Sequence, residues 1–204
     1  SKKALEMAGL KAEDLDLIVV GTISPDYQFP SCAAVVQGKL GNKKAFVFDV
    51  SAACAGSLYA LSVADRFVAT GAVRNALVIG VETLSRITDW TDRNTCVLFG
   101  DGAGAMVLQP TEDDRSGLRS IKLHTDGSLV PILLMPGGGS EEPINQALID
   151  AKSHYVKMNG REVFRQAVRK LPETVMESLA AVGLERKDID LFIPHQANLR
   201  ISEA

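Results

Sequence analysis

An internal repeat constrains the fold of this chain more than any other feature of its 204 residues. Residues 4–19 align with residues 178–193 without a gap, at a constant offset of 174 positions. Each copy has the pattern of a helix end, a glycine, a leucine, a charged turn, an aspartate and an apolar strand. A gapless match of this length indicates a duplicated α/β unit rather than a chance similarity.

The spacing of apolar residues over the first 81 positions predicts alternating strands and helices. Strands are expected where apolar residues run almost without interruption, and helices where apolar residues recur every three to four positions. The expected strands are residues 16–21, 45–50 and 76–81, and the expected helices are residues 2–8, 30–40 and 58–70. This alternation predicts an α/β fold with a mostly parallel sheet.

The pattern changes in the middle of the chain. Residues 96–99 and 105–108 are expected to form two strands joined by the glycine-rich turn 100–104, and residues 118–124 a further strand. The glycines are not expected to bind phosphate, because a strand follows them instead of a helix N-terminus.

The C-terminal third is predicted to contain a loop over residues 127–143 and a long amphipathic helix over residues 160–182, which Pro172 kinks or splits. The first repeat copy starts within its helix, and the second stops soon after its strand. We therefore expect an excerpt of a longer protein that lacks both ends. Residues 1–174 would be a first half without its start, with a connecting segment, and residues 175–204 the beginning of a second half.

Composition and charge argue against several classes of function. A net charge of −3 gives no reason to expect nucleic acid or an anionic membrane as a partner. No apolar run is long enough to span a membrane. The three cysteines lie far apart and show no metal-ligand spacing. We therefore expect no metal site and no disulfide framework, and a reducing, cytoplasmic location.

Cys54 is the first candidate catalytic residue. It lies in a run of small residues, 51–57, between an expected strand and an expected helix. At the first turn of a helix, unpaired N–H groups and the positive end of the dipole favour an anion, which would lower the pKa of the thiol and make it a nucleophile. The alternative is that Cys54 is only a small buried apolar residue, as most free cysteines are.

His195 is the second candidate. It follows the expected strand of the second repeat copy, at the carboxyl end where open α/β sheets bind ligands. The first copy has no histidine at the corresponding place, so the duplicated architecture does not require one. The alternative is a strand-end histidine that is satisfied by backbone groups.

Three segments together resemble a known family. Residues 49–56 (DVSAACAG), 99–105 (FGDGAGA) and 194–200 (PHQANLR) are similar to motifs of β-ketoacyl-(acyl-carrier-protein) synthase III, in the same order and at similar spacing. The resemblance covers essentially the whole chain. It implies a thiolase-like fold, a duplicated α/β sandwich, which agrees with the repeat found independently.

The resemblance implies a condensing enzyme that initiates fatty-acid synthesis. Cys54 would accept a short acyl group from acyl-CoA, and His195 would help to activate malonyl-(acyl carrier protein) for decarboxylative Claisen condensation. Phe29 matches a residue that shapes the acyl pocket across a homodimer interface, and Arg93 matches an arginine that contacts coenzyme A. No cofactor is implied beyond the coenzyme A thioester, which is a substrate.

Two further groups of residues carry roles by the same resemblance. The pantetheine tunnel would lie near Met158, Asn159 and Gly160. The acyl carrier protein would bind a segment made of Gln196, Ala197, Asn198, Leu199 and Arg200.

The sequence departs from the usual family pattern at Ser51, Ser57 and Asn94, where alanine, an aromatic residue and glycine are usual. The catalytic asparagine of the family would lie beyond Ala204, so we expect the 204 residues alone to be inactive. Two alternatives remain open. The chain could come from another thiolase-fold condensing enzyme that uses coenzyme A thioesters, or it could be an inactive fragment that keeps only a dimer surface.

Overall fold

The computed structural model describes residues 1–113 and 116–204. The chain forms two compact units. The first comprises Ser1–Thr83 and Asp101–Arg119, and the second comprises Leu84–Gly100 and Ser120–Ala204. The boundary expected at residue 174 was inferred from the internal repeat, whereas these units are defined by compactness. The expected boundary therefore stays a prediction. Within the described residues, no helix is both long enough and apolar enough to cross a membrane.

The first unit is built on a four-stranded sheet in the order β2-β1-β3-β4. Its strands are β1 (Leu17–Gly21), β2 (Phe46–Val50), β3 (Ala76–Thr83) and β4 (Asp101–Leu108). Strand β1 pairs in parallel with both β2 and β3, whereas β4 runs antiparallel to β3. The predicted α/β fold with a mostly parallel sheet is confirmed.

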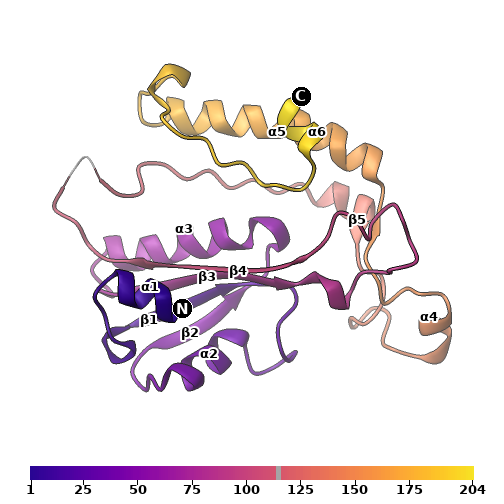
Figure 1. The fold of residues 1–204 in the computed structure, drawn as a ribbon, viewed down its shortest axis with the longest axis horizontal. Coiled ribbons are helices and arrows are strands. Elements are labelled where there is room, and N and C mark those ends of the chain that lie inside the picture. The colour runs from indigo at the N-terminus through magenta and orange to yellow at the C-terminus, as the bar shows by residue number, and fades with distance from the viewer. Residues whose placement is uncertain (114–115) are drawn as a thin grey trace. The chain divides into compact units, whose positions relative to one another are not determined.

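Helices cover both faces of this sheet (Figure 1). They are α1 (Lys2–Met7), α2 (Cys32–Leu40) and α3 (Gly56–Ala69). Because side chains alternate along a strand, Ile18 and Val20 pack in the core that α1 and α2 share, while Leu17 and Val19 pack in the core of α3. All four are fully buried, and each such side chain contributes about 1.5–3 kcal/mol. A continuous apolar run therefore marks the strand at the centre of the sheet.

Helix α2 shows how side chains fix an element. It begins at Cys32, after the cap Ser31, two residues later than the start that Pro30 suggested. The carboxylate of Asp49 on β2 accepts hydrogen bonds from the backbone N–H groups of Cys32 and Ala33, at 2.7 and 2.8 Å. The helix ends at Leu40 and is capped by Gly41, whose φ of 74° is left-handed, as its sequence position predicts.

The predicted glycine turn at residues 100–104 is wrong. Gly100 has no regular structure, and residues 101–104 belong to β4, in which Gly104 pairs with Gly80 and Gly102 pairs with Glu82 of β3. Residues 96–98 form a turn and Phe99 has no regular structure, so the expected strand is absent. The error has a physical reason. Pairing with β3 uses only backbone groups, so glycines can form the strand. Gly102 and Gly104 face open space, where no side chain is needed for packing.

The predicted strand at residues 118–124 is also absent. A strand needs a neighbour to accept and donate its backbone hydrogen bonds. In the sheet of the first unit, β2 and β4 are the edges, and neither pairs with this segment. An apolar pattern alone does not supply that partner.

The second unit is mainly helical. It contains α4 (Gln146–Asp150), α5 (Gly160–Ala180), α6 (Leu199–Glu203) and a two-stranded antiparallel sheet of β5 (Leu133–Leu134) and β6 (Lys157–Met158). Short 3-10 helices cover Leu84–Arg86 and Gly127–Ile132. Helix α5 is continuous through Pro172, so proline does not split it, and the alternative of a kink stays a prediction. Proline removes a single N–H donor from a helix of 21 residues, and the turns on either side persist.

Both repeat copies contain the same turn. The first has a 3-10 helix at Ala12–Asp14 and the second has one at Arg186–Asp188, each with a reciprocal capping box. The glycines before these turns, Gly9 and Gly183, have φ values of 65° and 68°. Residues that lie 174 positions apart in the two copies therefore have the same local structure.

The copies differ at the strand that follows. In the first copy β1 pairs on both sides. In the second copy, residues 190–193 form no strand among the described residues, and Leu191 and Ile193 are 75% and 77% exposed. The predicted second strand is therefore absent, because no neighbouring strand pairs with it here.

Candidate functional site

The carboxyl ends of three parallel strands meet at one edge of the sheet in the first unit. Gly21 of β1 is in register with Val50 of β2 and with Gly80 of β3. Ligands bind at this edge in open parallel α/β sheets. Cys54 lies just beyond the end of β2, so the chain delivers its thiol to this edge.

A sharp turn carries Cys54 from the strand to helix α3. Residues Ala53–Ala55 form a 3-10 helix, and α3 starts directly afterwards at Gly56. Ala53 has a φ of 45°, which is costly for a residue with a Cβ. No side chain caps the N-terminus of α3, so its first N–H groups stay available to an anion. The structure places Cys54 immediately before a helix N-terminus, close to its expected position.

Glycines allow the start of α3 to rest on the backbone of the sheet. A Cβ on Gly21 would lie 2.4 Å from the carbonyl carbon and oxygen of Gly56 and 2.8 Å from the nitrogen of Ser57. A Cβ on Gly80 would lie 2.8 Å from the Cβ of Ser57. Real Cβ atoms do not approach that closely, so these two strand positions require glycine. The backbone contact between Gly21 and Gly56 fixes how far the turn of Cys54 lies from the ends of the strands.

The pKa of the Cys54 thiol is raised, contrary to the lowering expected from the helix dipole. The residue is exposed at the surface, yet the surrounding protein withholds water from the sulfur, and this desolvation is the largest effect. The backbone N–H of Cys54 opposes it, and the negative charge of Glu82 adds to it. The thiol is therefore the resting form at neutral pH, and nucleophilic attack needs a proton acceptor.

Glu82 near the end of β3 fastens the segment that follows β1. Its carboxylate accepts hydrogen bonds from the backbone N–H of Ile23, at 3.0 and 3.2 Å, and from the hydroxyl of Ser24. The hydroxyl of Ser24 in turn accepts a hydrogen bond from the N–H of Thr83 at 2.8 Å. Residues 22–24 are thus held against β3 at the same edge as Cys54. Sequence reasoning did not single out Glu82, although a charged residue at the end of a buried strand is a usable signal.

Phe29 also belongs to the first unit. It lies in the segment between β1 and α2 and is 86% exposed. Tyr27 beside it is exposed as well. An exposed pair of aromatic rings is a common feature of protein contact surfaces.

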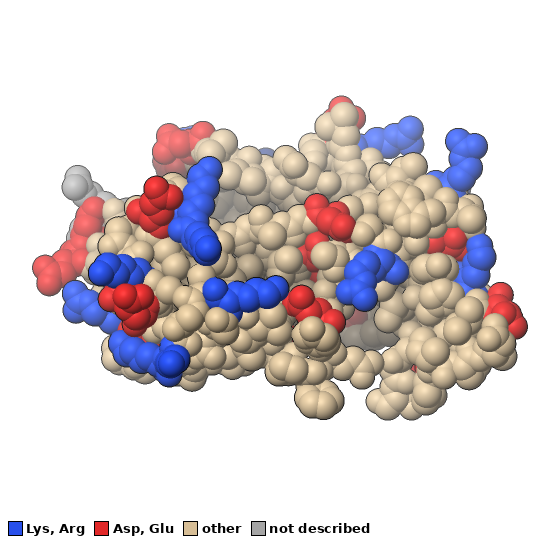
Figure 2. All heavy atoms as spheres, turned by 60° about the horizontal axis from the view of Figure 1, so that its bottom comes forward, with Lys and Arg blue, Asp and Glu red and all other residues tan. Residues whose placement is uncertain are grey.

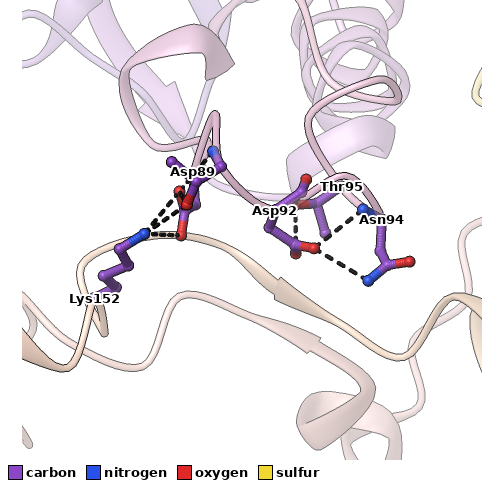
Figure 3. A network of polar contacts seen from close by, with 6 residues as sticks. Asp89, Asp92, Asn94, Thr95 and Lys152 are labelled. Carbon is purple, nitrogen blue, oxygen red and sulfur yellow. Dashed lines mark hydrogen bonds and ion pairs between the residues drawn. The ribbon is translucent and has the colours of Figure 1, made fainter.

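In the second unit, Arg93 lies within a loop of consecutive turns. The N–H of Asp92 bonds to the carbonyl of Asp89 at 2.9 Å, and the N–H of Thr95 bonds to the carbonyl of Asp92 at 3.2 Å. The Asp92 carboxylate accepts from the hydroxyl of Thr95 at 2.8 Å and from the N–H of Asn94 at 3.0 Å (Figure 3). These bonds, the hydroxyl of Thr95 first, lower the pKa of Asp92. These hydrogen bonds hold the loop in one conformation, and the Asp92 carboxylate is negatively charged at neutral pH.

The other aspartate of this loop is bound by a distant lysine. Lys152 donates from Nζ to Asp89 Oδ2 at 3.1 Å and to Thr91 Oγ1 at 2.5 Å (Figure 3). Thr91 donates to Asp89 from its hydroxyl at 2.6 Å and from its N–H at 2.9 Å. These contacts, those of Thr91 first and then that of Lys152, lower the pKa of the buried Asp89 to about 2. No sequence pattern predicted this pair, whose members lie 63 residues apart.

The residues expected near a pantetheine tunnel lie together at the start of α5. Met158 is the last residue of β6 and pairs with Leu133 of β5. Asn159 caps α5, because its side chain accepts a hydrogen bond from the N–H of Glu162 at 3.3 Å, and Gly160 is the first residue of the helix. The backbone N–H of Asn159 bonds to the carbonyl of Ile132 at 2.8 Å.

The segment of residues 194–200 is exposed over most of its length in the second unit. His195 is exposed, and Gln196 and Ala197 continue the chain without regular structure. Asn198 caps the short helix α6 by accepting a hydrogen bond from the N–H of Arg200 at 3.1 Å, and Leu199 begins that helix. The guanidinium of Arg200 is left for other partners, because only its backbone serves the cap.

The described residues were compared with the patterns of metal sites and nucleic-acid surfaces. No group of three or more His, Cys, Asp or Glu side chains gathers there in a way that could hold a metal ion. Figure 2 shows basic and acidic side chains intermingled over one face, instead of a basic stripe of the kind that follows a nucleic-acid backbone.

The comparisons with known proteins agree with the resemblance found from the three motifs. A sequence model of the family 3-oxoacyl-[acyl-carrier-protein (ACP)] synthase III matches residues 48–127, which include Cys54 and Arg93. A β-ketoacyl-[acyl-carrier-protein] synthase III of Natranaerobius thermophilus is 50% identical over 98% of this chain and 62% of its own length.

Solved structures share the fold as well. The 3-oxoacyl-[acyl-carrier-protein] synthase III of Aquifex aeolicus VF5 has a TM-score of 0.86 and 44% identity, over 98% of this chain and 60% of that one. The priming β-ketosynthase of the R1128 polyketide biosynthetic pathway has a TM-score of 0.85 and 35% identity, over 100% of this chain and 59% of that one. The expected fold class is confirmed, and this chain spans about 60% of the length of each relative named here.

Proposed function

We propose, from its membership of the β-ketoacyl-[acyl-carrier-protein] synthase III family, that this chain is the acyl-accepting part of a condensing enzyme that initiates fatty-acid synthesis. The observation that carries the proposal is the position of Cys54. Its thiol lies at the carboxyl edge of the sheet, on a strained turn, immediately before an uncapped helix N-terminus. Small residues surround it, so a bulky thioester can approach.

In the first half-reaction the sulfur of Cys54 attacks the carbonyl carbon of an acyl-CoA. The bond between that carbon and the sulfur of coenzyme A breaks, and coenzyme A leaves as a thiol with the proton that Cys54 releases. The raised pKa of Cys54 means that a base must accept this proton first.

In the second half-reaction a malonyl thioester of acyl carrier protein loses carbon dioxide. The electron pair of the broken bond forms an enolate, whose oxygen His195 stabilises by donating a hydrogen bond. The enolate carbon attacks the acyl group on Cys54, and the thiolate of Cys54 leaves. The product is a β-ketoacyl thioester, and no cofactor takes part.

The remaining residues have binding roles in this proposal. Arg93 meets the charged part of coenzyme A, and the pantetheine arm passes Met158, Asn159 and Gly160. Phe29 lines the acyl pocket of a second copy in a homodimer, in keeping with its exposure. The carrier protein binds the segment Gln196, Ala197, Asn198, Leu199 and Arg200, where the guanidinium of Arg200 meets its acidic surface. The cytoplasmic location stays a prediction.

The test uses the full-length protein and acetyl-CoA without an extender. Intact mass spectrometry should detect one acetyl group on the protein, and peptide mapping should locate it on Cys54. The variant Cys54→Ala should lose the adduct, while the control Cys96→Ala should keep it. A stable acetyl adduct on the Cys54→Ala protein, or no adduct on the unaltered protein, would contradict the proposal.

A second candidate is a priming synthase of secondary metabolism, which the structural similarity to the R1128 priming β-ketosynthase favours. Competition between malonyl-CoA and malonyl-(acyl carrier protein) as extenders separates the two. We expect the carrier-bound extender to be preferred, and the substitution Arg200→Glu to remove that preference, because it reverses the charge that meets the carrier.

A further inference from the structure

The loop of Arg93 contains two carboxylates that could compete for its guanidinium. Asp89 and Asp92 lie four residues and one residue before Arg93. Within the part of the chain that the structure describes, however, Arg93 is exposed and forms no hydrogen bond or ion pair of its own. A cation that stays free beside two anions needs an explanation.

The explanation lies in the partners of the two carboxylates. Asp92 is occupied by groups of its own loop, the hydroxyl of Thr95 and the N–H of Asn94. Asp89 is occupied by Thr91 and, from outside the loop, by the ammonium group of Lys152. Lys152 is thus the one cation bound to this loop in the described structure, where it balances the charge of Asp89 (Figure 3).

The backbone of Lys152 supports a specific role for its side chain. Lys152 follows α4 in a left-handed conformation with a φ of 55°, and its N–H bonds to the carbonyl of Ile149 at 2.9 Å. Glycine adopts this conformation at less cost and is the usual residue after a helix. Lys152 therefore adopts a backbone conformation that is unfavourable for a residue with a side chain. Its ion pair with the buried carboxylate of Asp89 offsets this cost.

We propose that Lys152 is a positioning residue that binds Asp89 and thereby leaves Arg93 free to bind the phosphates of the coenzyme A thioester. The inference rests on the proposed function, because it takes the acyl donor to be a coenzyme A thioester. A guanidinium on a rigid loop suits a phosphate, since little side-chain and backbone motion has to be frozen on binding. Without Lys152, Asp89 would draw Arg93 back and the phosphates would lose their partner.

The test measures binding of coenzyme A to the full-length protein by isothermal titration calorimetry. We expect Lys152→Met to raise the dissociation constant about five- to tenfold, since a charge-assisted contact is weakened but not deleted. Lys152→Arg should restore binding, because arginine also supplies a cation to Asp89. Lys152→Gly removes the cation and relieves the left-handed strain, so it should weaken binding without lowering the melting temperature by more than Lys152→Met does.

A double variant and a matched control separate this role from a merely structural one. Arg93→Met should weaken binding of coenzyme A, and adding Lys152→Met to it should have little further effect, because both act through one guanidinium. Lys170→Met breaks an exposed ion pair with Glu173 in the same unit and should leave binding unchanged. In kinetics, the KM for acetyl-CoA should rise in Lys152→Met with little change in kcat, whereas the KM for S-acetyl-pantetheine, which lacks the nucleotide phosphates, should not.

Three results would overturn the inference: no binding of coenzyme A by the unaltered protein, unchanged binding by Lys152→Met, or additive effects of the two substitutions. Failure of the proposed function looks different. In that case coenzyme A binds and the Lys152 variants behave as expected, but acetyl-CoA leaves no acetyl group on Cys54.

Discussion

The substitution Gly21→Ala should displace the turn that carries Cys54. The new Cβ would lie 2.4 Å from two atoms of Gly56 and 2.8 Å from the nitrogen of Ser57, all of them backbone atoms. Ordinary contact between carbon atoms is about 3.5–4.0 Å, so the start of α3 has to move away by roughly 1 Å. A gap of that size forfeits up to about half of the dispersion attraction between the facing atoms.

We expect this displacement to cost about 3 kcal/mol, at the upper end of the range for overpacked cores, because no flexible side chain is present to yield. For a chain of this size that corresponds to a fall in melting temperature of about 6–12 °C. Thermal unfolding followed by circular dichroism measures it. The rate at which iodoacetamide alkylates Cys54, followed by peptide mass mapping, reports the displacement of the thiol at temperatures where the protein stays folded.

Gly38→Ala is the matched control. Gly38 lies within helix α2, and a Cβ there would meet no atom within 4 Å. Alanine is favoured over glycine in a helix by about 0.8–1.0 kcal/mol, so this variant should be slightly more stable and should alkylate normally. If Gly21→Ala is as stable as the unaltered protein and its Cys54 reacts at the same rate, the reasoning from backbone contact is refuted.

Two further predictions concern polar groups of the first unit. Glu82→Gln should lower the pKa of Cys54, because the charge of Glu82 raises it, so the alkylation rate plotted against pH should shift to lower pH; an unchanged or upward shift would contradict this. Asn42→Ala should lower the free energy of unfolding in urea by about 2–4 kcal/mol, because the buried amide donates to the carbonyls of Ala12 and Leu15 and accepts from the N–H of Ala45, and these backbone groups would lose their partners. A loss below about 1 kcal/mol would mean that water replaces the amide.

Sequence reasoning predicted the elements that depend on neighbours along the chain. Strand β1 was recognisable from its continuous apolar run, and the ends of α2 and of the helix in each repeat copy from the left-handed glycines that follow them. The position of Cys54 between a strand and a helix followed from the same local signals. Each of these features is determined within about a dozen residues.

The errors concern features that depend on distant partners. Residues 101–104 form a strand because β3 is beside them, and residues 190–193 form none because no neighbouring strand pairs with them in the described structure. The pKa of Cys54 is raised by desolvation and by Glu82, which come from folding and not from the helix start alone. The ion pair of Lys152 with Asp89 joins segments 63 residues apart and leaves no periodic trace.

If Cys54 carries the acyl group as proposed, the close contact of α3 with Gly21 and Gly80 limits how the range of acyl substrates can change. At Gly21 the contact is made by backbone atoms alone, so no side chain can be shortened there to move the sulfur away and make room for a longer acyl chain. Selection for acyl chains of other lengths would have to change other walls of the acyl pocket, such as the exposed segment that carries Phe29. The position of the Cys54 sulfur would stay the same. Substitutions that change the preferred length of the acyl chain should therefore occur around Cys54 and not at Gly21 or Gly80.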